Sequence, residues 1–227
     1  MPQESIWEKE YQQSKLVTLG DEPQSDVLRY LKFLKKEQGV GLKNLKILDL
    51  GCGTGRNANY LAELGNEVAG IEISITAIRL AETRARQMGV KVKYLKQSMG
   101  ETYPFANNYF DLVIDITSSN SLNEVERQKY LVEVDRVLKT GGNFFVRALN
   151  KEGDKNAKNL LKTSPGREHD TYIMKGLGLT ERVFDRKDFV ELYSKYFKIL
   201  ELSKKTSYAR FNNQSYKRNY WLAYLKK

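Results

Sequence analysis

The stretch I-L-D-L-G-C-G-T-G-R-N at residues 47–57 constrains the fold of this chain more than any other segment. An apolar run that contains one acid, Asp49, is followed by glycines at three alternate positions, Gly51, Gly53 and Gly55. A helical pattern begins directly afterwards. A buried strand that turns through glycines into a helix brings backbone N–H groups close to a ligand. The stretch therefore predicts a ligand-binding turn at the end of a buried strand.

The glycine spacing separates two classes of nucleotide-binding turn. A dinucleotide fingerprint has the form G-x-G-x-x-G, and its third glycine would fall at Arg56. The run here is D-x-G-x-G-x-G, which resembles motif I of the class I S-adenosylmethionine (SAM)-dependent methyltransferases. The resemblance covers about residues 45–227. It implies an enzyme that binds SAM and releases S-adenosylhomocysteine (SAH).

Strand and helix patterns alternate along the chain after the first motif. We expect strands at residues 46–50, 67–72, 91–96, 110–116 and 143–149, with helices at 57–64, 75–87 and 123–138. Repeated strand–helix units imply a parallel sheet with helices on both faces. Two last strands, at 197–206 and 220–227, are too close for a helical crossover and should form an antiparallel hairpin. The expected fold is α/β, with a mostly parallel seven-stranded sheet like that of class I methyltransferases.

The remaining segments complete a single expected domain over residues 1–227. Helical patterns at 5–15 and 25–38 predict an N-terminal helical cap over residues 1–41. The polar run at 150–166 predicts a loop, and residues 185–196 predict another helix.

The composition excludes several kinds of protein. No apolar run approaches the roughly 18 residues of a membrane helix, and the N-terminus lacks an apolar signal segment. Cys52 is the only cysteine and His169 the only histidine, so internal disulfides and a Cys/His metal site are excluded. We expect a cytoplasmic protein without a metal or a membrane partner. Monomer and homodimer both remain open.

Parallel sheets bind ligands at the carboxyl ends of their strands, where several polar residues of this chain fall. Asp49 either orients the cofactor's ammonium or stabilises the turn. Glu72 follows Gly55 by 17 residues, and the resemblance implies that it holds the ribose hydroxyls. The resemblance places Ser98 and Met99 against adenine, although the family often has Asp in place of this serine. The predicted cofactor-binding residues are Asp49, Gly51, Cys52, Gly53, Thr54, Gly55, Asn57, Glu72, Ile73, Ser98, Met99, Asp115, Ile116 and Thr117.

Methyl transfer from a sulfonium requires alignment of the two reacting atoms and exclusion of water. A general base is needed only when the acceptor is protonated at neutral pH. Three residues are candidates for this base: His169, Asp115 and Tyr172. His169 is either a poised base or a surface-loop residue without a role. Asp115 lies in an apolar strand, and its burial requires a partner, either the ligand or a helix amide.

Positive charge is concentrated in the last third of the chain. Of the net charge of +10, residues 151–227 carry 18 basic against 9 acidic residues, while residues 1–150 carry 20 against 19. Such an excess suits either an acidic partner or a solvated surface. Short chains with this motif spacing more often resemble small-molecule methyltransferases, and a basic pocket suits a carboxylate or phosphate. The resemblance and the charge together lead us to expect a small, acidic metabolite as the methyl acceptor. The expected substrate contacts are Trp7, Tyr11, Arg147, His169 and Arg210.

Other functions remain open. Residues 203–221 contain no acid and interleave Lys and Arg with aromatic residues, a pattern in which bases stack and phosphates bind. RNA methylation through this segment is one alternative, and a non-catalytic SAM-binding protein is another. Aminopropyl transfer from decarboxylated SAM requires an acidic pocket for the cationic polyamine, so the positive charge of the C-terminal third argues against this reaction.

Overall fold

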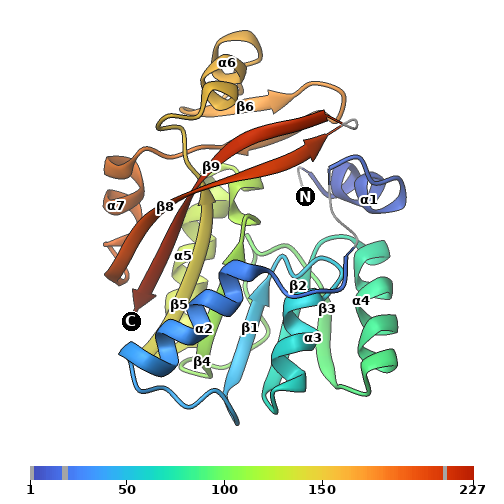
Figure 1. Cartoon of the computed structure of the whole chain (residues 1–227), viewed down its shortest axis with the longest axis vertical. Helices are drawn as coiled ribbons and strands as arrows, with labels where there is room; N and C mark the ends of the chain where they lie inside the picture. The colour runs from blue at the N-terminus through green and yellow to red at the C-terminus, as the bar shows by residue number, and fades with distance from the viewer. Residues whose placement is uncertain (1–2, 17–19, 212–213) are drawn as a thin grey trace.

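The computed structural model describes residues 3–16, 20–211 and 214–227. Its main sheet has seven strands in the order β3-β2-β1-β4-β5-β9-β8 (Figure 1). Strands β1 to β5 pair in parallel, and β9 runs antiparallel to β5 and β8. The predicted α/β class and the antiparallel C-terminal pair are confirmed. The strands of this sheet are β1 (Lys46–Leu50), β2 (Glu67–Glu72), β3 (Val92–Lys96), β4 (Phe110–Ile116), β5 (Leu138–Leu149), β8 (Lys198–Phe211) and β9 (Gln214–Lys226).

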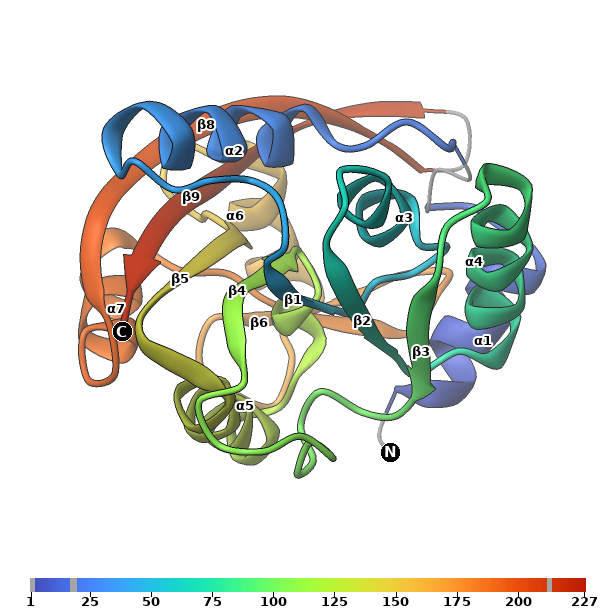
Figure 2. The same cartoon turned by 90° about the horizontal axis from the view of Figure 1, so that it is seen from below.

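Helices cover both faces of the sheet (Figure 2). On one face, α2 (Ser25–Glu37) and α3 (Arg56–Glu63) bury their apolar side chains against β1, β4 and β9. On the other, α5 (Glu124–Val137) and α7 (Arg186–Tyr193) do the same. Helix α4 (Ile75–Met88) packs on β3 and α3. Each face thus has its own apolar cluster, as a sheet buried on both sides requires.

The two N-terminal helices have different places in the fold. Val27 and Leu34 of α2 are completely buried in the core, so this helix packs directly on one face of the sheet. Helix α1 (Glu4–Gln12) lies instead at the carboxyl ends of the strands, beside α4 (Figure 1). Glu8 of α1 accepts hydrogen bonds from the Ser74 hydroxyl (2.7 Å) and the Thr76 backbone N–H (3.2 Å). A carboxylate at the N-terminus of α4 favours this docking.

The segment after β5 forms a small second layer rather than the predicted polar loop. It contains α6 (Lys155–Thr163) and a separate antiparallel pair, β6 (Thr171–Met174) and β7 (Leu179–Arg182). The Asp154 side chain accepts a hydrogen bond from the backbone N–H of Ala157 (2.8 Å) and so caps α6. This capping signal and the apolar spacing behind it were present in the sequence.

The C-terminal hairpin is longer than expected. Pairing between β8 and β9 continues from Lys205–Tyr220 outward to Phe211–Gln214. Most of residues 203–221 are therefore strand, and both strands of the expected hairpin are longer than the predicted ranges 197–206 and 220–227. The hairpin extends past the main sheet towards α6 and β6 (Figure 1). Among the residues described, no helix is long and apolar enough to cross a membrane.

Helix α5 offers a matched test of the core. The Val134 side chain is completely buried, whereas Val125 on the same helix is 80% exposed. We expect Val134→Ala to lower the free energy of unfolding by about 2 kcal/mol, because it removes two buried methyl groups and leaves a cavity. Val125→Ala should change it by less than about 0.5 kcal/mol. Chemical denaturation of both variants measures the difference, and equal effects would contradict this packing.

Candidate functional site

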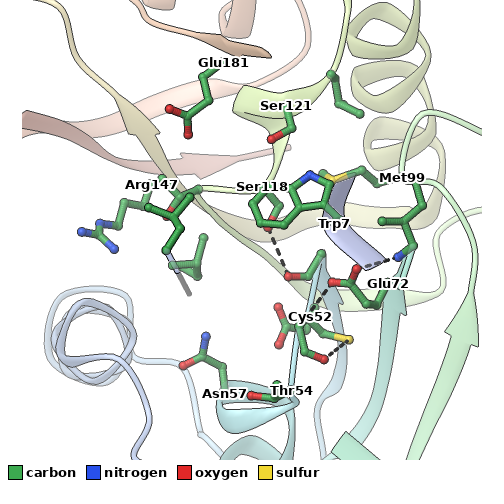
Figure 3. A pocket seen from close by; sticks show the side chains of 18 of the residues that line it. Trp7, Cys52, Thr54, Asn57, Glu72, Met99, Ser118, Ser121, Arg147 and Glu181 are labelled. Atoms are coloured by element: carbon green, nitrogen blue, oxygen red, sulfur yellow. Dashed lines mark hydrogen bonds between the residues drawn. The ribbon is translucent and has the colours of Figure 1, made fainter. Parts of the chain in front are cut away.

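A cavity of about 590 Å³ opens at the carboxyl ends of the central strands. Its lining comes from the glycine turn after β1, the ends of β2 and β3, and the loop after β4 (Figure 3). Helix α1, strand β7 and the outer part of the C-terminal hairpin supply the remaining walls. The cavity thus lies where an open parallel sheet is expected to bind its ligand.

The glycine turn requires its glycines for two different reasons. Gly51 (φ 63°) and Gly53 (φ 54°) line the cavity in left-handed conformations. A Cβ atom at Gly53 would stand 2.6 Å from the hydroxyl oxygen of Tyr11. Gly55 does not line the cavity, because it packs the start of α3, and a Cβ atom there would meet the Tyr94 hydroxyl at 2.3 Å. Only the first two glycines therefore open backbone to a ligand.

Glu72 ties the turn to the end of β2. One of its carboxylate oxygens accepts hydrogen bonds from the backbone N–H groups of Ile73 (2.8 Å) and Ser74 (2.9 Å), and the other accepts one from Gly53 (2.9 Å). Burial raises the pKa of the Glu72 carboxyl, while these three donors act in the opposite direction. The side chain lines the cavity with a fixed orientation.

Asp49 is a buried acid with one unsatisfied oxygen. Its side chain is 1% exposed, and Oδ2 has no hydrogen-bond partner among the described residues. Burial, with Asp115 and Glu72 nearby, raises the pKa of Asp49 to about 8. Because Asp49 lines the cavity, a ligand ammonium could satisfy it. The site therefore fits a ligand that carries a positive charge at this point.

Other predicted cofactor contacts also line the cavity: Cys52, Thr54, Asn57, Ile73, Ser98, Met99, Ile116 and Thr117. Burial raises the pKa of the Cys52 thiol well above its usual value, so this thiol stays protonated and is a poor nucleophile. Ser98 already accepts a hydrogen bond from the Gly100 N–H (3.1 Å). Asn57 accepts one from the Gln24 N–H (2.9 Å) and so joins α2 to the site.

Asp115 does not line the cavity, although we predicted it as a cofactor or catalytic residue. It is completely buried, and its two oxygens accept hydrogen bonds from the Tyr130 hydroxyl (2.7 Å) and from the backbone N–H groups of Ser118 (2.9 Å) and Ser119 (3.3 Å). Asp115 thereby shapes the loop after β4. The Ser118 hydroxyl of this loop donates to the Gly51 carbonyl (3.2 Å) and completes the wall.

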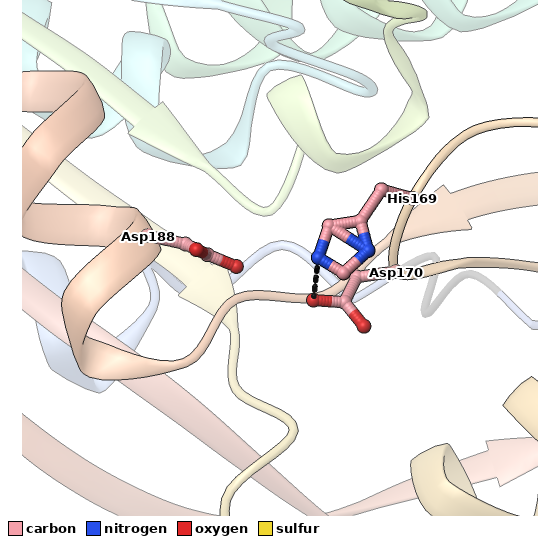
Figure 4. Close-up of side chains that lie close together, drawn as sticks. All are labelled: His169, Asp170 and Asp188. Atoms are coloured by element: carbon pink, nitrogen blue, oxygen red, sulfur yellow. Dashed lines mark ion pairs between the residues drawn. The ribbon is translucent and has the colours of Figure 1, made fainter.

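His169 lies outside the cavity lining, contrary to its prediction as base and substrate contact. Its side chain is 74% exposed, with Nε2 3.3 Å from a carboxylate oxygen of Asp170 (Figure 4). Asp188 is close by, and these three residues have the composition of a metal site. The Lys151 ammonium pairs with Asp170 and lies 2.9 Å from Asp185 and 3.7 Å from Asp188. A lysine therefore already contacts the acids of this cluster and offsets part of their charge.

Some of the predicted substrate contacts line the cavity, whereas His169 does not. Trp7, Tyr11 and Arg147 line the cavity. The Arg147 guanidinium lies 3.8 Å from the ring centre of Tyr220, and its Nε is 3.4 Å from Asp26. The Arg210 side chain lies outside the part of the chain that the structure describes.

Tyr172, the third candidate base, is completely buried and absent from the lining. Its hydroxyl donates to the Glu181 carboxylate (2.6 Å), which does line the cavity. Sequence reasoning missed Glu181 and Arg218, because only the pairing of β6–β7 and β8–β9 brings them here.

Arg56 was also missed as a site residue, although its place inside the glycine motif was visible in the sequence. It is partly buried in the cavity wall and forms no ion pair with the described residues. Burial and the proximity of Arg147 lower the pKa of its guanidinium.

Comparison with known proteins assigns the family. Residues 47–142 match the model of a family described as a methyltransferase domain. An uncharacterized methyltransferase of Schizosaccharomyces pombe is 30% identical over 112 residues, which are 49% of this chain and 77% of that protein. The chain belongs to the methyltransferase family, and its fold is that of the class I SAM-dependent enzymes. The Escherichia coli O9:H4 ubiquinone biosynthesis O-methyltransferase is 28% identical over 141 residues, 59% of this chain and 58% of that protein.

Solved structures of other methyltransferases have the same fold as this chain. A SAM-dependent methyltransferase from Methanosarcina mazei superimposes with a TM-score of 0.76 at 24% identity, covering 91% of this chain and 98% of its own. The Burkholderia thailandensis 1,6-didemethyltoxoflavin-N1-methyltransferase, solved with SAH bound, gives a TM-score of 0.70 at 15% identity, with coverages of 99% and 86%.

The close approach at Gly53 yields a test of the turn. We expect Gly53→Ala to weaken SAH binding by about tenfold or more, because the new Cβ atom meets the Tyr11 hydroxyl and covers ligand-facing backbone. Gly39→Ala is a matched control, since Gly39 has a similar φ of 64° with nothing within 4 Å of an added Cβ. Isothermal titration calorimetry compares the two. Equal SAH affinities would show that Gly53 does not face the cofactor.

Proposed function

We propose that this methyltransferase transfers the methyl group of SAM to a small, acidic metabolite. The observation that carries the proposal is the Arg56 guanidinium, which lines the cavity without an ion pair among the described residues. A partly buried cation without an ion pair favours an anionic ligand group nearby, even though the Asp49 carboxyl is close enough to raise the pKa of Arg56. Arg147 lies in the same wall and lowers the pKa of Arg56, as two nearby cations do.

The cofactor would occupy the part of the cavity next to the glycine turn. Glu72 would accept the ribose hydroxyls, Ser98 and Met99 would contact adenine, and Gly51 and Gly53 would face the methionine part. Asp49 would hold the ammonium, which its unsatisfied Oδ2 favours. SAM supplies an activated methyl group on sulfur, and the chain's own task is alignment and exclusion of water.

The C-terminal hairpin supports a small acceptor over RNA. Lys205 is 2.5 Å from Asp26, Arg218 Nε is 3.4 Å from Asp154, and Lys204 pairs with Glu152. Tyr220 is buried beneath Arg147, and Phe211 packs on the apolar cluster around Tyr172. Cations and aromatic rings that already have partners make a poor platform for phosphates and bases. The substrates in the names of the ubiquinone and toxoflavin methyltransferases are also small molecules.

Methyl-labelled SAM and a cell extract test the proposal. The extract is split into small-molecule, RNA and protein fractions, and we expect label in the small-molecule fraction. Label in RNA would overturn the acceptor class. Label in none of the fractions, with SAH binding intact, would favour the non-catalytic alternative.

A substitution at Arg56 tests the acidic character of the acceptor. Arg56→Gln should raise the acceptor KM by about tenfold or more, because it removes the cation that faces the acceptor's anionic group. Arg167→Gln, at an exposed position outside the cavity, is the matched control and should leave KM unchanged. A loss of SAH affinity with an unchanged acceptor KM would assign Arg56 to the cofactor instead.

The raised pKa of Asp49 predicts how cofactor affinity depends on pH. Below pH 8 the Asp49 carboxyl of the free protein is mostly protonated. The ligand's ammonium stabilises the ionised carboxylate, so binding of the ligand releases this proton. SAH affinity should therefore fall on the order of tenfold between pH 7.5 and pH 6, where the ligand's ammonium stays charged. Asp49→Asn should flatten this dependence, whereas Asp111→Asn, outside the cavity, should keep it. Isothermal titration calorimetry at several pH values measures this dependence. If SAH affinity in Asp49→Asn varies with pH as in the wild type, the contact between Asp49 and the ammonium is rejected.

A further inference from the structure

Glu181 is a carboxylate on the acceptor side of the cavity. It lies on β7, across the cavity from the glycine turn, and faces the space between Arg147 and the loop after β4 (Figure 3). The residue is only 8% exposed. A nearly buried acid at this place requires either a partner or a function.

Three buried residues hold this carboxylate from behind. The Tyr172 hydroxyl donates to Oε2 of Glu181 (2.6 Å), and Arg218 donates to the Tyr172 hydroxyl oxygen. The Arg218 guanidinium lies 4.0 Å from Glu181, and its Nε is 3.4 Å from Asp154. The Tyr172 hydroxyl bonds to Oε2 and Arg218 lies nearest to the same oxygen, whereas Oε1 accepts no hydrogen bond from the described residues. The network fixes the orientation of Glu181 and leaves one oxygen for a ligand.

Helix α1 fixes the strand that carries Glu181. The Gln3 side chain accepts a hydrogen bond from the Thr180 N–H (2.7 Å) and donates to the carbonyls of Thr180 (2.9 Å) and Ser121 (2.5 Å). It therefore joins β7 to the loop after β4, whose residues Thr117, Ser118 and Ser121 also line the cavity. A group held on paired strands and clamped to its neighbour is preorganised for reaction.

The other acids at the site have positions or partners that favour other roles. Both oxygens of Glu72 accept backbone hydrogen bonds beside the turn, and Asp115 lies outside the lining. The Glu126 side chain accepts from the Asn123 N–H (3.1 Å) as part of the cap of α5. Asp49 is beneath the glycine turn, where the cofactor's ammonium is expected. In this wall, Glu181 thus has both a fixed orientation and a carboxylate oxygen, Oε1, that accepts no hydrogen bond from the described residues.

We infer that Glu181 is the general base of the methyl transfer, and this inference rests on the proposed function. It calls for an acceptor whose nucleophile is a hydroxyl or a protonated amine. The O–H or N–H proton moves to Oε1 of Glu181, and the nucleophile's electron pair forms the bond to the methyl carbon. The carbon–sulfur bond breaks, and its electrons remain on sulfur as SAH forms. The proton leaves Glu181 for solvent when the products depart.

The test compares variants on whichever extract fraction the wild-type enzyme labels. Glu181→Gln preserves the shape of the side chain and an acceptor for the Tyr172 hydroxyl, but cannot take up a proton at neutral pH. We expect its kcat to fall by about 100-fold or more, with acceptor KM and SAH affinity unchanged. Glu191→Gln is the matched control, an exposed position outside the cavity, and should keep wild-type kcat.

Chemical rescue separates a base from a structural residue. Added formate should raise the rate of Glu181→Ala, because it can enter the space of the missing carboxylate and accept the proton. A rate that formate leaves unchanged would overturn the base role, as would wild-type kcat in Glu181→Gln. Neither of these two results would contradict the proposed methyl transfer by the wild-type enzyme. A wild-type enzyme that labels none of the fractions would instead refute the proposed function, and the role of Glu181 with it.

Discussion

The three hydrogen bonds to the Glu72 carboxylate are the interaction on which the site depends. They join the turn after β1, the end of β2 and the start of α4, three segments that the chain reaches one after another. The backbone at Gly53 is already positioned for a ligand because this carboxylate accepts its N–H. Burial raises the pKa of the Glu72 carboxyl, and the three backbone donors of the turn act in the opposite direction.

The walls of the cavity are assembled from distant parts of the chain by polar side chains. Glu8 connects α1 to α4, and Gln3 connects α1 to β7 and to the loop after β4. The short layer of α6, β6 and β7 packs on the outer half of the hairpin through its own apolar cluster. The main sheet makes the half of the cavity beside the glycine turn, and these added segments make much of the other half. Differences in acceptor among such enzymes are expected to arise there.

Both halves of the cavity carry acidic and basic groups. Asp49, Arg56 and Glu72 lie at or beside the glycine turn, while Arg147, Arg218 and Glu181 lie in the walls made by β5, β7 and β9. The positive charge counted in the last third of the sequence is not a single binding surface, because Lys204, Lys205 and Arg218 are paired with acids of other segments. Charge composition thus indicated the sign of the region but not which cations face a ligand.

The sequence alone determined the succession of strands and helices along the chain, the glycine turn, and which residues follow the end of each central strand. These features are local, since a glycine's allowed φ and a strand's apolar run depend on near neighbours. Only the tertiary structure decided that Asp115 turns inward to Tyr130, that His169 lies on the surface, and that Glu181 and Arg218 reach the cavity. The positions of Asp115, Glu181 and Arg218 depend on strand register, since a shift of one residue would turn each of these side chains to the opposite face. The position of His169 depends on packing between segments far apart in the chain.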